Sequence, residues 1–130
     1  MIEEGRPLYL QIAESVEDSI IDGSLAEEGQ APSTNELAAF YRINPATAAK
    51  GVTVLVDKNV LYKRRGVGMF VAPGARARLL AERRDAFAAT YVDPLLAEAQ
   101  KLGLTPADLG AIILERSRRT EAVTTEGTAP

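Results

Sequence analysis

Apolar residues recur at every fourth position from Leu8 to Ile20. Residues with this spacing lie on one side of an α-helix, so the pattern predicts a helix over residues 8–22 with a single buried stripe. Gly23 follows as a typical C-terminal cap. Residues 23–32 contain two glycines and a proline and are expected to form a loop.

Two further helices are predicted close together. Ser33 and Glu36 have the spacing of a capping box, in which the serine hydroxyl and the glutamate carboxylate each accept a backbone N–H at the helix start. Asn44 is a favoured N-cap and is followed by a proline, so the next helix is expected to run to about Lys58. Two helices separated by a tight turn form the layout of a helix-turn-helix.

A β-hairpin is predicted next, over residues 60–71. Two β-prone runs flank a glycine-rich turn at residues 66–68, and three basic residues, 63–65, lead into that turn. A proline and Gly74 then mark a boundary. Residues 1–74 are therefore expected to form a winged helix-turn-helix, in a fold that is mostly α-helical with one small β-hairpin.

The second half of the chain predicts helices only. Residues 75–102 favour a long helix that Pro94 should kink or break, and Thr105 is expected to cap another helix. Residues 75–120 are interpreted as an α-helical dimerisation region and the polar residues 121–130 as a disordered tail. The apolar residues expected to form a dimer interface with two-fold symmetry are Leu79, Phe87, Tyr91, Leu95, Leu109, Ile112 and Ile113.

Two alternatives concern these helices. In one, they fold back onto the winged domain of their own chain instead of pairing with a second copy. In the other, they also enclose a small-molecule effector of unknown identity, with Tyr91 and its apolar neighbours as candidate lining residues. Core packing explains Tyr91 without any ligand.

The formal net charge is −3, but the charges are unevenly distributed. Residues 1–41 carry one basic and nine acidic residues, whereas residues 42–68 carry six basic residues and one acidic residue, a local charge of +5. Salt screens charges more than about 8 Å apart, so a polyanion interacts with the local charge rather than with the overall sum. The basic stretch favours a nucleic-acid partner, and a solvated face is the alternative.

Cysteine and histidine are both absent. This excludes disulfides, thiolate chemistry and the usual zinc ligands, and we expect no metal or other cofactor. Glu14 and Asp18 lie one helical turn apart, but a solvated face explains them better than a catalytic pair does, so we expect no enzyme. No apolar stretch is long enough to cross a membrane, and the acidic start lacks the layout of a signal peptide, so we expect a cytoplasmic protein.

The predicted elements fit double-stranded DNA. A helix matches the width of the major groove, and the N-terminus at Asn44 presents backbone N–H groups and a partial positive charge to phosphates. Lys50 lies one turn further along, within reach of a base edge or a phosphate. The residues of the hairpin expected to neutralise phosphates or to approach the minor groove are Lys63, Arg64, Arg65, Gly66 and Gly68.

Several short stretches together form a known pattern. They are Pro7-Leu8-Tyr9 with Gln11-Ile12-Ala13, Ile20-Ile21-Asp22-Gly23-Ser24-Leu25, Pro32-Ser33, Glu36-Leu37-Ala38, Ile43-Asn44-Pro45 with Thr47, and Leu61-Tyr62 followed by Arg64-Arg65-Gly66-Val67-Gly68-Met69-Phe70-Val71. Through them, residues 6–73 resemble the DNA-binding domain of the GntR family of bacterial regulators, and the short C-terminal part resembles the YtrA-like subgroup. The resemblance implies a sequence-specific transcription regulator, usually a repressor, that binds a palindromic operator as a homodimer.

The resemblance also implies which residues contact DNA. Asn35 and Ala49 stand where the family usually has arginine or another basic residue. These two departures favour the alternative of a winged-helix protein-interaction module with weak or no DNA binding. Carried over to this chain, the contacts are Ser33, Thr34, Asn35, Asn44, Ala46, Thr47, Lys50, Arg65, Gly66 and Gly68.

Overall fold

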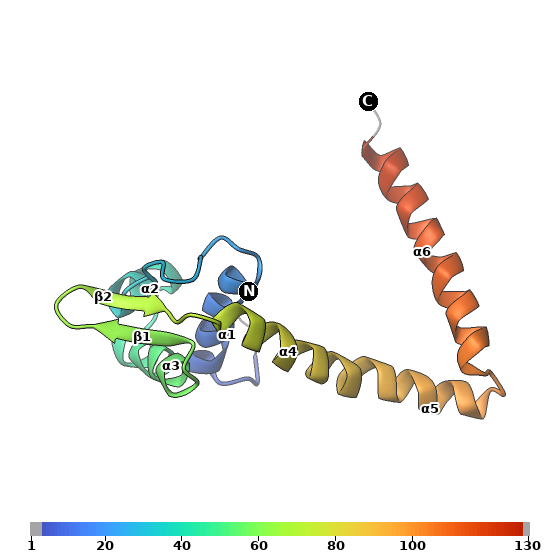
Figure 1. Ribbon diagram of the computed structural model, residues 1–130, viewed down its shortest axis with the longest axis horizontal. Helices are drawn as coiled ribbons and strands as arrows, with labels where there is room; N and C mark the ends of the chain where they lie inside the picture. The colour runs from blue at the N-terminus through green and yellow to red at the C-terminus, as the bar shows by residue number, and fades with distance from the viewer. Residues whose placement is uncertain (1–3, 129–130) are drawn as a thin grey trace. The chain divides into compact units, whose positions relative to one another are not determined.

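The computed structural model describes the backbone of residues 4–128 and the side chains of residues 4–123. Two compact units, Met1–Arg83 and Arg84–Pro130, divide the chain. The fold is mostly helical with one two-stranded antiparallel hairpin, as predicted (Figure 1). In chain order the elements are α1 (Leu8–Ile21), α2 (Thr34–Tyr41), α3 (Pro45–Asp57), β1 (Leu61–Arg64), β2 (Gly68–Val71), α4 (Ala75–Phe87), a π-helical segment η1 (Ala88–Val92), α5 (Asp93–Lys101) and α6 (Pro106–Thr128).

The core of the first unit forms between α1 and α3. The predicted stripe of α1 is buried at Ile12, Val16 and Ile20. Leu55 of α3 is fully buried in the same cluster. The helices approach closely because residue 51 is glycine: a Cβ there would lie 2.9 Å from the backbone oxygen of Tyr9. This close crossing fixes the position of α3, the helix predicted to enter DNA.

The capping residues of α2 and α3 act as the sequence predicts. The Ser33 hydroxyl accepts the Glu36 N–H at 3.0 Å, and the Glu36 carboxylate accepts the Ser33 N–H at 2.9 Å. The bond from the Ser33 N–H holds the pKa of Glu36 below its ordinary value. At α3, the Asn44 side-chain oxygen accepts the Ala46 N–H at 2.8 Å. Between the helices Arg42 adopts the left-handed conformation, with φ of 54°, and so turns the chain sharply.

The hairpin has a third, short neighbour that the sequence prediction missed. Residues 23–32 were expected to be a loop, but Gln30 pairs with Phe70 on β2 in an isolated antiparallel bridge. The Ala31 N–H donates to the Met69 carbonyl at 2.8 Å. These bonds cover one edge of β2, which the sequence pattern alone gave no reason to expect because the segment lacks β-branched residues and alternation.

The first turns of α4 belong to the winged domain. Ala75 and Leu79 are buried in its core, with 0% and 1% of their surface exposed. Leu79 is therefore wrongly assigned to the dimer interface in the sequence prediction, because its side chain is already covered within its own chain. Further along α4, Glu82 pairs with Lys58 at 2.9 Å and Arg83 pairs with Asp18 at 2.6 Å.

In the second unit, Pro94 does not interrupt the helical path. The π-helical segment η1 ends immediately before α5, and the Asp93 N–H donates to the carbonyl of Ala88, five residues earlier. Proline has no N–H to donate, and this wider turn accommodates the missing bond. The Thr105 hydroxyl accepts the Asp108 N–H at 3.1 Å and so caps α6 as predicted.

The C-terminal part differs from the prediction in two respects. A disordered tail was expected over residues 121–130, but α6 continues to Thr128; residues 129–130 lie outside the described residues. Leu109, assigned to the dimer interface, is 7% exposed and so is already largely covered within the chain. Along the described residues, no helix combines the length and apolar character that a membrane crossing requires.

Candidate nucleic-acid interface

The outer face of α3 is open to solvent. Its inner face is covered by contacts with α1, α2 and β1, so this helix has one packed side and one free side. The predicted contact residues Asn44, Ala46 and Lys50 are exposed and Thr47 is half-buried. Small side chains at the helix start leave its backbone accessible, which suits insertion into a groove.

The start of α2 presents a second set of predicted residues. Ser33 and Asn35 are exposed and Thr34 is half-buried. The Ser33 hydroxyl and the Asn44 amide oxygen are both used as caps, so each already accepts a backbone N–H. A capped helix start still carries a partial positive charge, which favours a nearby phosphate.

Lys50 has a neighbour that sequence reasoning missed. Its Nζ lies 4.1 Å from the centre of the Tyr9 ring, on α1. An ammonium over the face of an aromatic ring is attracted by the π electrons. Tyr9 therefore holds the lysine side chain along the outer surface of α3. In the sequence, Tyr9 stood out only as one of the residues that carry the family resemblance.

The hairpin carries three exposed basic residues, Lys63, Arg64 and Arg65. The turn is closed by a bond from the Val67 N–H to the Arg64 carbonyl at 3.0 Å, and Gly66 within it has φ of 76°. Glycine adopts this conformation at no steric cost, because it lacks a Cβ. In the described part of the chain Lys63 and Arg65 have no ion pair, so these two are available to a polyanion.

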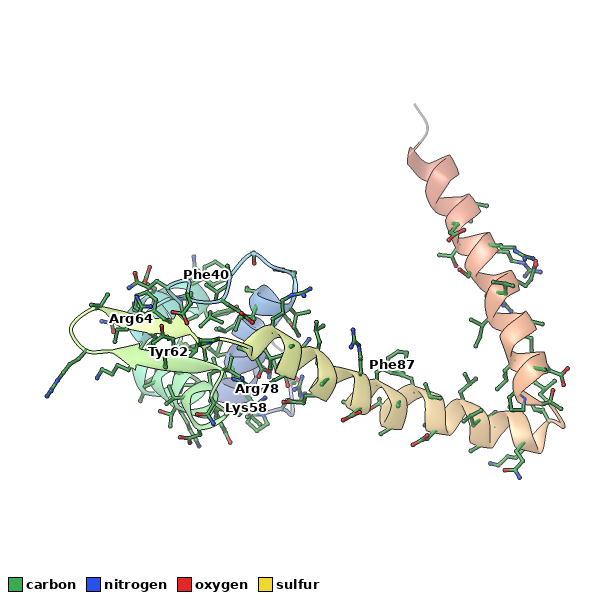
Figure 2. The ribbon with its side chains drawn as sticks, in the orientation of Figure 1. Phe40, Lys58, Tyr62, Arg64, Arg78 and Phe87 are labelled. Atoms are coloured by element: carbon green, nitrogen blue, oxygen red, sulfur yellow. The ribbon has the colours of Figure 1, made fainter. Side chains whose placement is uncertain are left out.

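Arg64 differs from its neighbours because its guanidinium has partners within the chain. It donates to the Glu28 carboxylate at 2.9 Å and to the Tyr62 hydroxyl at 2.7 Å. Its central carbon lies 4.1 Å from the centre of the Phe70 ring. Figure 2 labels Tyr62 and Arg64 on the hairpin.

The backbone angle and the packing of residue 68 also require glycine there. Its φ is 142°, and a Cβ there would lie 2.6 Å from Nε2 of Gln30. That amide group donates to the Val67 carbonyl at 3.0 Å. Close approach to a groove is thus not needed to explain this residue, although it stays a prediction for Gly66, where a Cβ would meet open space.

The basic surface is smaller than the charge count of the sequence suggests. Lys58 pairs with Glu17 and Glu82, and Arg64 pairs with Glu28. Of the six basic residues counted between positions 42 and 68, the exposed ones without an ion pair in the described chain are Arg42, Lys50, Lys63 and Arg65. Arg42 occupies the turn between α2 and α3 and was not among the predicted contacts.

The second unit exposes most of the residues predicted to form a dimer interface. Phe87 and Tyr91 are 58% and 65% exposed, and their ring centres lie 5.6 Å apart. Figure 2 shows Phe87 on α4. The large apolar side chains exposed in this unit also include Leu95, Leu96, Leu102, Ile112, Ile113, Leu114 and Val123.

The comparisons with known proteins identify the family. The crystal structure of a transcriptional regulator of the GntR family from Bacteroides thetaiotaomicron is 31% identical, with a TM-score of 0.73; the match covers 87% of this chain and 98% of that one. Residues 8–71 also match the family described as bacterial regulatory proteins, gntR family. The chain belongs to the GntR family.

Two further relatives are regulators or DNA-binding domains. The HTH-type transcriptional regulator YhcF of Bacillus subtilis is 25% identical over 107 residues, which cover 82% of this chain and 87% of YhcF. The crystal structure of the AraR DBD in complex with operator ORX1 is 30% identical, with a TM-score of 0.51, over 55% of this chain and 87% of that one. This GntR protein is thus a transcriptional regulator with a winged helix-turn-helix DNA-binding domain, and not an enzyme.

Proposed function

We propose that this GntR-family chain is a homodimeric repressor that binds a palindromic operator. In each copy, α3 enters the major groove, the start of α2 contacts the phosphate backbone and the tip of the hairpin contacts the adjacent phosphates. The observation that carries the proposal is the combination of one exposed face of α3 with a hairpin tip whose Lys63 and Arg65 form no ion pair with a described residue. The AraR DBD, which is similar over the same region, is in complex with an operator.

The residues proposed to contact the bases lie on the exposed face of α3. Lys50 is long enough to reach a base edge or a phosphate, and Ala46 and Thr47 permit close contact with the groove floor. Asn35 and Ala49 are exposed but uncharged, so the number of phosphate contacts is modest. We therefore expect a shallower dependence of affinity on salt than a winged helix with basic residues at both places would have.

The second unit supplies the dimer contacts in this proposal. Its large apolar side chains are exposed at several positions of η1, α5 and α6, and a two-fold interface would cover them. Two-fold symmetry of the protein requires two half-sites on the DNA. The similarity to the HTH-type transcriptional repressor YtrA of Bacillus subtilis, 27% identical over 57% of each chain, supports the YtrA-like subgroup. Work on chromosomal DNA implies a cytoplasmic protein. A small-molecule effector would act by changing the spacing of the two DNA-binding domains.

A fluorescence-anisotropy titration tests the DNA contacts. The probe is a labelled duplex from the region upstream of the chain's own gene, titrated at several salt concentrations. Arg65→Ala and Lys50→Ala should each reduce the slope of log affinity against log salt by about 0.9. Arg116→Ala, an exposed arginine of α6, is the matched control and should leave the slope unchanged.

Two results of this titration would contradict the proposal. An unmodified chain that binds no duplex at low salt would support the protein-interaction module instead, which the uncharged Asn35 and Ala49 favour. Equal slopes for Arg65→Ala and Arg116→Ala would remove the hairpin tip from the interface.

Sedimentation of the full chain tests the dimer. Phe87→Glu with Ile113→Glu places charges on two exposed apolar positions and should convert a dimer to a monomer. Thr90→Glu adds charge at an exposed polar position and is the control. A shortened chain for the same purpose has to keep α4 to Arg83, because Ala75 and Leu79 belong to the core of the winged domain. An unmodified chain that sediments as a monomer would contradict the proposal.

A further inference from the structure

We propose that Arg64 is a positioning residue of the hairpin, which fixes it to the segment before α2, and that Arg65 alone of the two arginines binds phosphate. The charge pattern of the sequence assigned both arginines to phosphates, whereas the family resemblance carried over only Arg65. The inference rests on the proposed function in that it takes the hairpin to contact DNA.

The contacts of Arg64 occupy both an edge and a face of its guanidinium. Nη2 donates to Oε2 of Glu28 at 2.9 Å and to the Tyr62 hydroxyl at 2.7 Å, while Nε also lies 3.2 Å from that hydroxyl. Its central carbon lies 4.1 Å from the centre of the Phe70 ring, and Phe70 is itself 7% exposed. A phosphate would have to displace several of these partners at once.

Tyr62 closes the cluster without any charge of its own. Its hydroxyl donates to Oε2 of Glu28 at 2.6 Å and accepts from Arg64. An exposed ion pair alone contributes little to stability, but here the pair is joined to a hydroxyl and to a ring stack. Glu28, Tyr62 and Arg64 thus form one connected group, which we call the latch.

The latch lies beside a set of backbone bonds between two distant segments. The Glu28 N–H donates to the Val71 carbonyl at 2.8 Å, and the Val71 N–H donates to the Gly29 carbonyl at 3.0 Å. Four residues after Gly29, Ser33 caps α2. The latch therefore holds the hairpin against the segment that leads directly into α2, so that two parts of the DNA-binding surface keep a fixed separation.

Arg65 has none of these constraints. It is exposed in the turn, and it forms no ion pair with any residue that the structure describes. Charged side chains without internal partners contribute to the release of counterions on binding DNA. A positioning residue instead changes the affinity at every salt concentration by the same factor.

The experiment measures the binding of a labelled duplex of random sequence, together with the upstream duplex, against salt concentration. Arg64→Ala should weaken binding to the upstream duplex about tenfold with an unchanged salt slope, whereas Arg65→Ala should lower the slope by about 0.9. Arg64→Lys keeps the charge but lacks the planar group, so it should behave like Arg64→Ala. Rescue by Arg64→Lys, or a slope lowered as in Arg65→Ala, would overturn the inference.

Tyr62→Phe provides a variant without any change of charge. It should weaken binding to the upstream duplex at unchanged slope, because the latch loses its central hydroxyl. If Arg64 were a phosphate ligand, removing the Tyr62 hydroxyl, which competes for its guanidinium, would leave the affinity for DNA equal or raise it. That change is opposite to the one expected here.

Amide hydrogen exchange tests the latch independently of DNA. Exchange of the Ala31 and Val71 amides, which donate to Met69 and Gly29, should become faster in Arg64→Ala and Tyr62→Phe but not in Arg65→Ala. Unchanged exchange in both latch variants would refute the latch even if DNA binding behaves as proposed. A chain that binds no duplex but shows the faster exchange would refute the proposed function and leave the latch standing.

Discussion

Lys58 donates a hydrogen bond to the carboxylate of Glu17 at 2.7 Å and thereby joins the end of α3 to α1. The Glu17 side chain is only 6% exposed, and Lys58 also bonds to Glu82 on α4 at 2.9 Å. Burial lowers the pKa of Lys58, but the hydrogen bonds and charges of the two glutamates outweigh it and raise the pKa above the ordinary value of 10.5. Three helices therefore meet at one ammonium group. Figure 2 labels Lys58.

Replacing Lys58 with methionine should lower the free energy of unfolding by about 1–3 kcal/mol, because Glu17 loses its nearest partner while it stays buried. Urea unfolding measures the change, and the exposed Lys63→Met is the control, expected to stay within about 0.5 kcal/mol. The raised pKa means that the contribution of Lys58 is complete below pH 10.5 and is lost only as the pH rises through its folded-state value. A salt slope for DNA binding that falls in Lys58→Met would contradict the structural role.

Glu36→Gln should destabilise the chain at neutral pH and have less effect in acid. The pKa of Glu36 is lowered by its bond with the Ser33 N–H, so the carboxylate stabilises the fold above its ordinary value of 4.5. That contribution disappears as the pH falls through the lower, folded-state pKa. Denaturant midpoints of the two chains, measured from pH 7 to pH 3, should therefore converge. A constant difference across this range would show that the charge is irrelevant to the cap.

Two glycine replacements should change the stability of the chain in opposite directions. Gly51→Ala places a methyl group 2.9 Å from the Tyr9 carbonyl and should destabilise the winged domain, although alanine favours helices. Gly110 lies in α6, and a Cβ added there would meet no neighbouring group within 4 Å. Gly110→Ala should therefore stabilise that helix by about 0.5–1 kcal/mol. Thermal unfolding followed by circular dichroism measures both. Stabilisation by Gly51→Ala would mean that α1 and α3 are further apart than described.

Gly68→Ala should cost about 1–3 kcal/mol, because alanine is strained at a φ of 142° and its methyl group would clash with Gln30. The double variant Gly68→Ala with Gln30→Ala removes the clash but not the backbone strain. In the Gln30→Ala background, Gly68→Ala should therefore still lower the free energy of unfolding, but by less than it does in the unmodified chain. A double-mutant cycle in urea measures this difference. Full recovery would show that crowding alone requires glycine here.

The local signals of the first half of the chain were sufficient to predict its elements. The stripe of α1, the capping box at Ser33 and the N-cap at Asn44 each act through residues within a few positions of one another. Interactions of this range can be recognised from spacing alone. The exposed face of α3 followed for the same reason, because one buried stripe determines which side is free.

The ion pairs that the sequence did not reveal join distant segments. Arg64 lies 36 residues from Glu28, and Lys58 lies 41 residues from Glu17. Counting charges along the chain treats such residues as free, so the basic surface was overestimated. Leu79 was misassigned for a related reason: an apolar residue on a long helix has the same sequence signal whether its own chain or a second copy covers it.

The π-helical segment η1 acts as a one-residue insertion in the register of a helix. In an uninterrupted α-helix each residue advances by about 100°, so one additional residue in a turn rotates all that follows by that angle. Leu95 and Leu96 are consequently out of phase with Phe87 when compared with a regular helix. Deletion of a single residue between 88 and 92 would shorten the chain only slightly, yet it would rearrange the whole apolar pattern of α5 relative to the end of α4.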